Sequence, residues 1–266
     1  MSDRDGRFAD GRLFYRVWDS ASATALVVLA HGYAEHSGRY EHVGQALAKA
    51  GFATWALDHF GHGQSEGERA VIGSVESAVA DLDSFVDLAT AEAPDLPVFL
   101  VGHSMGGLIA TAYAEDHQNR LAGLVLSGAA LAANPAILAL ADMDEIPEMP
   151  LAPLVSRDPA VVADYESDPL NYTGPFPRKA LDALGVIGSV RSRLGELTIP
   201  LLVMHGSDDA LVPAQAAEDA AAAVSSADVK LHIWPGLFHE IFNEPEKDEV
   251  IAEMVSWISQ RADGKK

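Results

Sequence analysis

A serine turn between an apolar run and a helical stretch constrains this chain more than any other feature. Within residues 98–114, the run VFLV leads to Gly102, and Ser104 and Gly106 complete the pattern Gly-x-Ser-x-Gly before residues typical of a helix. In a strand–turn–helix context this pattern strains the serine backbone and lifts its hydroxyl out of the sheet. A Cβ at either glycine would collide with the neighbouring strand and helix. We expect Ser104 to be a nucleophile, and the alternative is a glycine-rich turn with a bystander serine.

Strand-like and helix-like segments alternate along most of the chain. The run ALVVLA at 25–30 is typical of a strand buried on both faces, and the apolar positions of 74–92 recur at helical spacing. This alternation predicts an α/β fold with a mostly parallel, doubly wound sheet. The expected strands are 11–18 at the sheet edge, 25–30, 52–57, 98–101, 121–128, 200–206 and 229–234, and the expected helices are 43–50, 74–92, 108–114, 213–224 and 246–259.

The alternation breaks between about residues 129 and 198. This stretch has several short apolar runs, no clear strand, and prolines at 135, 147, 150, 153, 159, 169, 175 and 177. We therefore expect a small helical insertion that caps the sheet. The predicted organisation is a core of residues 1–128 and 199–266 with a cap, or lid, at 129–198.

A nucleophilic serine needs a base to take its proton and a carboxylate to orient that base. In this kind of fold the acid and then the histidine follow the serine, each on a loop after a late strand. The loop after 200–206 offers Asp208 and Asp209, which spacing alone does not separate. The loop after 229–234 carries His239. Both loops are expected at the carboxyl ends of parallel strands, the edge where the serine also lies.

The ten histidines of the chain must be separated before one is named as the base. His239 alone follows the last strand on a glycine-bearing loop, so we predict that it is the base. His205 and His232 belong to strands, where a hydrogen-bonded structural imidazole is expected. Four histidines lie in turns before or at the serine turn, in the wrong chain order: His31, His59, His62 and His103. Three are expected in loops or at the surface: His36, His42 and His117.

Two backbone N–H groups are needed to hold the oxyanion of a tetrahedral intermediate. The N–H of Met105 directly follows Ser104 at the start of a helix, where unpaired N–H groups favour negative charge. The second donor is expected from the loop after 25–30, and we choose the N–H of Tyr33. Beyond their backbones, the side chains of Met105 and Tyr33 are expected only to pack.

Composition limits the partners and the location of the chain. The 18 Lys and Arg against 39 Asp and Glu give a formal net charge of -21, which repels phosphate backbones and anionic membranes. We expect no nucleic-acid partner, and at most transient contact with lipid micelles or a neutral membrane surface. The absence of cysteine excludes disulfides and thiolate chemistry. No secretory signal or membrane span of ~18 apolar residues is present, so a cytoplasmic location is expected.

Four segments carry a resemblance to a known family. They are VGHSMGG at 101–107, HGYAEHSGRY at 31–40, DHFGHGQSEG at 58–67 and YESDPL at 165–170. Together they resemble the monoacylglycerol lipases, serine hydrolases of the α/β-hydrolase fold, and the likeness runs from about residue 10 to 260. The resemblance implies that the nucleophile is Ser104, the acid Asp209 and the base His239, and that Tyr33 and Met105 form the oxyanion hole.

The resemblance also implies an activity. The acyl ester substrate would be monoacylglycerol, cleaved to a free fatty acid and glycerol through an acyl-enzyme on Ser104, with no metal or organic cofactor. A lysophospholipase or a general short- or medium-chain carboxylesterase would keep the same catalytic residues. More distant alternatives are a cofactor-free haloperoxidase-like enzyme, a C–C bond hydrolase and a non-catalytic binding module. Glu35 and Arg39 match a family pair that is expected to brace the loop of the oxyanion hole.

The cap departs from the family pattern. Between Ala133 and Asp158 it is shorter than in the longer-capped members, so their preference for acyl chain length is not implied here. The apolar segments 136–140 and 149–155 are candidates for lining an acyl site or meeting a lipid surface. The alternative is that they only pack the cap onto the sheet.

Overall fold

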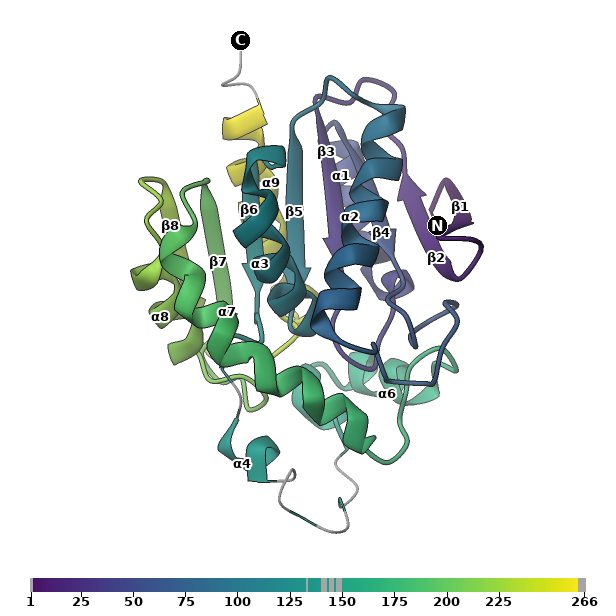
Figure 1. Cartoon of the computed structure of the whole chain (residues 1–266), viewed down its shortest axis with the longest axis vertical. Coiled ribbons are helices and arrows are strands. Elements are labelled where there is room, and N and C mark those ends of the chain that lie inside the picture. The colour runs from purple at the N-terminus through teal and green to yellow at the C-terminus, as the bar shows by residue number, and fades with distance from the viewer. Residues whose placement is uncertain (1, 133, 140–142, 144–145, 147–149, 263–266) are drawn as a thin grey trace.

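The computed structural model describes residues 2–132, 134–139, 143, 146 and 150–262. These residues form one sheet of eight strands in the order β1-β2-β4-β3-β5-β6-β7-β8 (Figure 1). All the strands from β4 to β8 in this order are parallel, whereas β2 is antiparallel to both of its neighbours. The strands are β1 (Arg4–Phe8), β2 (Leu13–Trp18), β3 (Ala25–Ala30), β4 (Phe52–Leu57), β5 (Val98–His103), β6 (Gly123–Ser127), β7 (Leu201–Gly206) and β8 (Val229–Trp234).

Helices cover both faces of the sheet, so the predicted doubly wound α/β architecture is confirmed. On one face, apolar residues of α1 (Glu41–Lys49) and α9 (Lys247–Ala262) share a core with the strands. On the other face the core includes residues of α2 (Val75–Glu92), α3 (Met105–His117), α7 (Ile187–Arg193) and α8 (Gln215–Ala223). Among the described helices, none combines the length and apolar character that a membrane-spanning helix needs.

The edge of the sheet differs from the sequence-based prediction. The strand expected at the edge over 11–18 is β2, and it is second from the edge because β1 pairs outside it. The sequence of β1, RDGRF, alternates half-buried and exposed positions, so it lacks the apolar run that marks a strand. It pairs because the turn at Ala9 and Asp10, both at positive φ, folds it back onto β2 as a hairpin.

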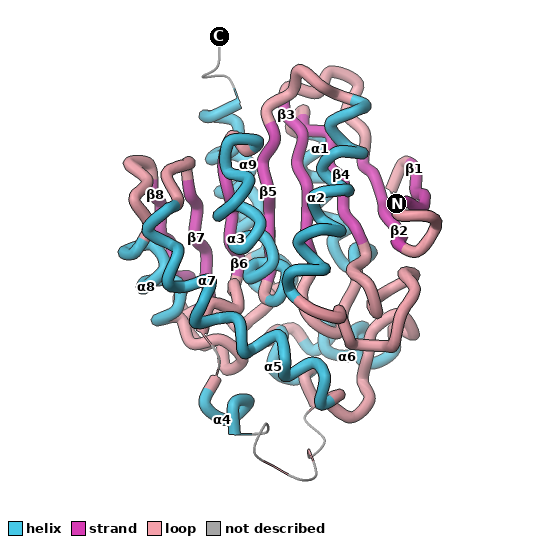
Figure 2. The backbone as a smooth tube through the Cα atoms, viewed as in Figure 1, coloured by secondary structure: helices cyan, strands magenta, loops and turns pink. Residues whose placement is uncertain are grey.

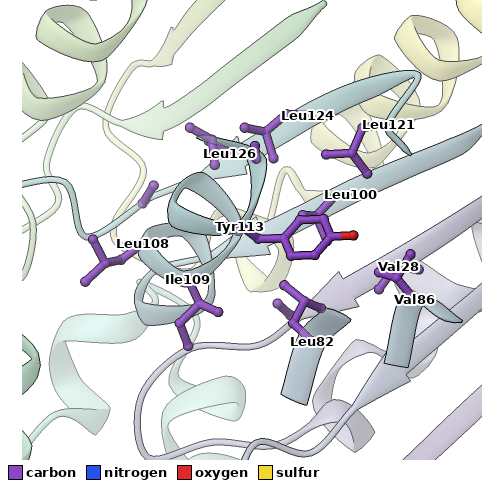
Figure 3. Packing of buried hydrophobic residues seen from close by; sticks show 14 of the residues in the cluster. Val28, Leu82, Val86, Leu100, Leu108, Ile109, Tyr113, Leu121, Leu124 and Leu126 are labelled. Atoms are coloured by element: carbon purple, nitrogen blue, oxygen red, sulfur yellow. The ribbon is translucent and has the colours of Figure 1, made fainter. Parts of the chain in front are cut away.

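The helix that follows the serine turn is anchored deep in the core. Leu108, Ile109 and Tyr113 of α3 are buried against the sheet and α2. Figure 3 shows these side chains among Leu82 of α2 and Leu100 of β5. Because α3 is packed in this way, the turn at its start lies in the buried part of the molecule.

Residues 129–198 connect β6 to β7, and their described part contains helices and no strand. Figure 2 shows α5 and α6 across one end of the sheet, whereas α7 packs beside α3. Ala133, Leu140 and Met149, named in the sequence analysis of this stretch, lie outside the described residues. Its helical elements are α4 (Pro135–Leu138), α5 (Ala152–Val155), α6 (Pro159–Ser167), α7, and the 3-10 helices η4 (Arg178–Val186) and η5 (Leu194–Glu196).

Candidate active site

Ser104 occupies a strained turn between β5 and α3. Its backbone has φ 52° and ψ -119°, outside the regions that residues with a side chain favour. A Cβ on Gly102 would lie 2.6 Å from the carbonyl oxygen of Gly106, and one on Gly106 would lie 2.2 Å from that of Ala30. The N–H of Ser104 donates to the carbonyl of Ser127 at 3.0 Å. The two glycines therefore permit the turn, and hydrogen bonding to β6 holds it.

The structure brings Ser104, Asp209 and His239 together from three loops. The Nε2 atom of His239 lies 2.8 Å from the hydroxyl oxygen of Ser104, and its Nδ1 lies 2.7 Å from Oδ2 of Asp209. Since β5, β7 and β8 are parallel, their carboxyl ends present these three side chains at one edge of the sheet. With the imidazole proton on Nδ1 facing the carboxylate, Nε2 is free to accept the serine proton.

Spacing leaves Asp208 and Asp209 open, and the structure separates them. The Asp208 side chain is exposed and accepts a hydrogen bond from the Ser207 hydroxyl at 2.6 Å. Asp209 is buried, and it is the aspartate that contacts His239. The resemblance to the lipases implied the same choice.

The Asp209 carboxylate is held by donors on both oxygens. Oδ1 accepts the N–H groups of Leu211 at 2.8 Å and Val212 at 2.9 Å, and Oδ2 lies 2.9 Å from Nε2 of His205 as well as close to His239. Burial alone would raise the pKa of Asp209. The neighbouring imidazoles and their hydrogen bonds outweigh burial, so this pKa lies well below its usual range.

His239 is buried together with other titratable groups. Burial lowers the pKa of its imidazole, but the charge and hydrogen bond of Asp209, followed by the charges of Glu240 and Glu35, raise it above the ordinary value. The His103 ring lies 4.8 Å from the His239 ring, centroid to centroid. The negative groups around His239 therefore favour a proton on this imidazole, which a general base must hold during the reaction.

The loop that carries Tyr33 approaches the serine closely. A Cβ on Gly32 would lie 3.1 Å from Cβ of Ser104, and both Tyr33 and Met105 line the pocket beside it. In the described part of the chain, the N–H groups of Tyr33 and Met105 donate no hydrogen bond to another residue. Two unpaired backbone donors next to a serine hydroxyl are the arrangement an oxyanion hole requires.

A pocket of about 900 Å³, including the space open to solvent, lies over Ser104. Within the described residues, no group of three or more His, Asp or Glu side chains is placed to hold a metal ion. The pocket wall is mostly apolar and combines residues of the stretch 129–198 with residues that precede and follow it, among them Tyr33, Leu108, Ile137, Leu151, Val155, Phe176 and Leu184.

Comparisons with known proteins show the family to which the chain belongs. The sequence profile described as "Serine aminopeptidase, S33" matches residues 21–246. The monoacylglycerol lipase of Mycolicibacterium smegmatis is 42% identical over 259 residues, which cover 93% of this chain and 92% of that protein. The chain belongs to the monoacylglycerol lipase family. The human monoglyceride lipase is 37% identical over 269 residues, 95% of this chain and 89% of its own.

A solved structure supports the same placement. The monoacylglycerol lipase of Paleococcus ferrophilus is 29% identical and has a TM-score of 0.83, covering 94% of this chain and 99% of its own. The predicted α/β-hydrolase fold and the resemblance to the monoacylglycerol lipases are therefore both confirmed, and the chain is a hydrolase.

Two of the segments that carry the family resemblance meet in space. His36, from HGYAEHSGRY, lies 2.8 Å through Nε2 from Oδ2 of Asp168, in YESDPL. The N–H of Tyr172 donates to the carbonyl of Ala34 at 2.9 Å. His36 is expected in a loop or at the surface; it lies in a loop, but only 4% of it is exposed, and its Nε2 contacts Asp168. Residues 168 and 172 of the stretch 129–198 thus contact the segment that includes Tyr33.

The family pair Glu35 and Arg39 contacts this loop directly. Oε1 of Glu35 accepts the N–H of Gly32 and the hydroxyl of Tyr40, each at 2.6 Å. Its Oε2 accepts from Nη1 of Arg39 at 3.1 Å. These contacts leave the loop backbone little freedom beside Ser104.

Sequence reasoning missed Glu240, which directly follows His239. Glu240 is 4% exposed and binds Arg39 through both carboxylate oxygens, with Nη2 to Oε2 at 2.7 Å. Arg39 therefore joins two buried carboxylates, Glu35 and Glu240. The partners are 201 residues apart in the chain, so no spacing pattern indicates the pair. The position next to His239 is the only signal in the sequence.

Proposed function

We propose that this chain hydrolyses monoacylglycerol to a free fatty acid and glycerol. Ser104 acts as nucleophile, His239 as base and Asp209 as the residue that orients it. The observation that carries the proposal is the unbroken series of contacts from Ser104 through His239 to Asp209 beside a largely apolar pocket. The relatives named monoacylglycerol and monoglyceride lipase support the choice of substrate.

The proposed reaction has two halves. Nε2 of His239 takes the proton of Ser104 as the serine oxygen attacks the ester carbonyl. The N–H groups of Tyr33 and Met105 donate to the oxyanion that forms. The imidazolium, stabilised by Asp209, then gives its proton to the departing glycerol oxygen. Water attacks the acyl-enzyme in the same way, and the proton returns to Ser104 as the fatty acid leaves.

The pocket lining suits the two parts of a monoacylglycerol. Its apolar wall would hold the acyl chain, and the part of the lining that includes Tyr165 would face the uncharged hydroxyls. We include in the proposal a core of residues 1–128 and 199–266 and a cap of 129–198, because the latter stretch contributes Ile137, Leu151 and Val155 to the wall.

The proposal also covers where the chain acts. A composition without cysteine supports a cytoplasmic enzyme. The formal charge of -21 supports contact with lipid micelles or neutral membrane surfaces that is transient at most, because such a charge is repelled by anionic lipid.

The test is fatty-acid release from a chain-length series of monoacylglycerols by the wild type and by Ser104→Ala. The serine hydroxyl contributes little packing, so the variant should fold with the wild-type melting temperature. We expect kcat to fall by at least about 10³-fold. A folded variant that keeps substantial turnover would contradict the assignment of the nucleophile.

The same assay separates the alternative substrates. Lysophospholipids, di- and triacylglycerols and p-nitrophenyl butyrate are measured beside the monoacylglycerols. Turnover confined to monoacylglycerols supports the proposal, and the best chain length then measures the pocket. A preference for lysophospholipids indicates a lysophospholipase, and turnover of the activated short ester alone indicates a general carboxylesterase.

A further inference from the structure

The proposed reaction requires two loops to keep a fixed relative position. The hole loop, residues 31–35, carries the N–H of Tyr33, and the base loop, residues 235–243, carries His239. The carbonyl carbon must be reached by Ser104 while its oxygen meets Tyr33 and the proton passes to His239. A displacement of one loop relative to the other by about 1 Å is enough to slow such a reaction by about 10²-fold.

A continuous set of contacts joins these loops through Arg39. On the side of the base loop, the Glu240 carboxylate binds both terminal nitrogens of Arg39, with Nη2 to Oε2 at 2.7 Å. On the side of the hole loop, Nη1 of Arg39 donates to Oε2 of Glu35 at 3.1 Å, and Oε1 of Glu35 accepts the N–H of Gly32 at 2.6 Å. The series therefore starts one residue after the base and ends one residue before Tyr33.

The three side chains are almost completely shielded from water. The side chains of Arg39, Glu35 and Glu240 are 4%, 2% and 5% exposed. The guanidinium carbon of Arg39 lies 4.7 Å from the centre of the Tyr165 ring. Bidentate, charge-assisted hydrogen bonds of this kind fix geometry, and a buried charge that loses its partner is strongly destabilising. Water cannot replace Glu240 here without a change in the position of Arg39.

We propose that Glu240 is a positioning residue for the hydrolysis, holding the base loop against the hole loop through Arg39 and Glu35. The inference rests on the proposed roles of Tyr33 and His239. Asn243 supports this geometry, because its side-chain amide donates to Oε2 of Glu240 at 2.8 Å. The N–H of Glu240 also donates to the carbonyl of Val155 at 2.8 Å, so the same residue contacts the cap.

The charge of Glu240 affects the pKa of His239, so the positioning role can be distinguished from a purely packing role by the pH dependence of activity. Two carboxylates share one guanidinium, which leaves negative charge close to His239 and helps to raise the pKa of its imidazole. Burial first, and then the charge of Glu240, raise the pKa of Glu35 to about 7. The other titratable or charged groups around His239 come from four elements: Asp209 and His205 near β7, His103 at the end of β5, and Glu35, Arg39 and Tyr40 on the hole loop and the 3-10 helix η1 (Ser37–Tyr40).

The experiment is steady-state hydrolysis of a monoacylglycerol by the wild type, Glu240→Gln and Glu240→Asp across acidic to alkaline pH. For E240Q we expect kcat to fall about 10- to 100-fold with little change in KM. The acid limb of kcat/KM should move to lower pH, because the imidazolium of His239 loses a neighbouring negative charge. E240D keeps the charge but shortens the side chain, so kcat should fall while the acid limb stays at its wild-type position.

Glu244→Gln is the matched control. Glu244 is fully buried near the base loop, accepts the N–H of Phe238 at 2.8 Å, and has its charge balanced by Arg157 at 2.9 Å. E244Q should lose stability as E240Q does, yet keep the wild-type acid limb. Equal shifts of the acid limb in E240Q and E244Q would overturn the proposal, as would wild-type kcat in E240Q.

A double-mutant cycle with Arg39→Lys tests the path of the effect. Adding E240Q to this variant should lower kcat by much less than it does in the wild type, because the contacts of Arg39 with Glu240 and Glu35 are already disrupted. Independent, multiplicative losses would overturn the proposal. If E240Q does not fold, E240D and R39K carry the test, and wild-type kcat in both contradicts it. A wild type without turnover refutes the proposed function itself, which is a separate outcome.

Discussion

The serine turn and the base loop each hold a buried histidine, and the pKa values of the two imidazoles differ. His103, at the end of β5, is 3% exposed, and His239 is 4% exposed. Their ring centroids lie 4.8 Å apart. The pKa of His103 is nevertheless lowered to about 3, chiefly by burial and then by the charge of His239. The pKa of His239 is raised above its ordinary value.

The partner of Nδ1 explains much of this difference. In His103, Nδ1 lies 3.0 Å from the carbonyl oxygen of Ser127, an uncharged acceptor. In His239, Nδ1 lies 2.7 Å from the carboxylate of Asp209. A carbonyl fixes the ring without compensating a buried positive charge, whereas a carboxylate does both. The uncharged carbonyl leaves the burial of His103 uncompensated, whereas the Asp209 carboxylate favours the charged form of His239, as the candidate base requires.

Removing the Asp209 carboxylate should remove most of the difference in pKa between His239 and His103. Of the three predictions, this one has the largest expected effect on kcat. Asp209→Asn keeps the shape of the side chain but loses its charge and presents an amide to Nδ1. We expect kcat for monoacylglycerol hydrolysis to fall about 10³- to 10⁴-fold, since His239 then holds its proton on the wrong nitrogen. Steady-state kinetics measure the loss.

Asp208→Asn is the matched control for this prediction. It removes the same charge one residue away, at an exposed position whose partner is Ser207. Its kcat should stay within about twofold of the wild type, because exposed charges are screened by solvent. Comparable losses in the two aspartate variants would show that Asp209 does not act through His239.

The pH dependence of kcat/KM compares His239 with His103 directly, and its expected effect is smaller. His239 accepts a proton only when neutral, so activity is lost as the pH falls through its pKa, which lies above 6.5. We expect kcat/KM to fall about tenfold for each pH unit below that value. NMR titration of the imidazoles should show His239 taking up its proton in the same range while His103 stays neutral. An acid limb well below pH 6.5 would contradict this prediction.

The core of the fold was readable from the sequence because its strands are buried on both faces. The apolar runs at 25–30 and 52–57 are β3 and β4 residue for residue. The hairpin strand β1 was missed because two of its five positions are exposed and none is fully buried, so its sequence has no apolar run. Its pairing depends on the turn at Ala9 and Asp10, where neither residue is the glycine that usually marks positive φ.

The candidate site was readable only where chain order carries information. Ser104 and His239 stand out by their loops, whereas Asp208 and Asp209 differ in burial, which spacing does not contain. The ion pair between Arg39 and Glu240 joins residues 201 positions apart, and no local sequence pattern indicates that they are partners. Contacts of this kind arise from tertiary packing, so the sequence gives the parts of the site without the connections between them.

His103→Asn should show the smallest effect, because it replaces the structural histidine with a side chain that can still donate to Ser127. The lost ring contacts should lower the free energy of unfolding by about 1–2 kcal/mol, and kcat/KM should fall less than about tenfold.

His103 takes up its proton near pH 6.5 in the unfolded chain and near pH 3 in the folded one. The unfolded state therefore binds more protons in this interval, and this residue lowers stability as the pH falls through it. Denaturant unfolding between these pH values should show that the variant loses less stability on acidification than the wild type does. If H103N instead loses as much kcat as Asp209→Asn, His103 is not structural, and the contrast between the two histidines fails.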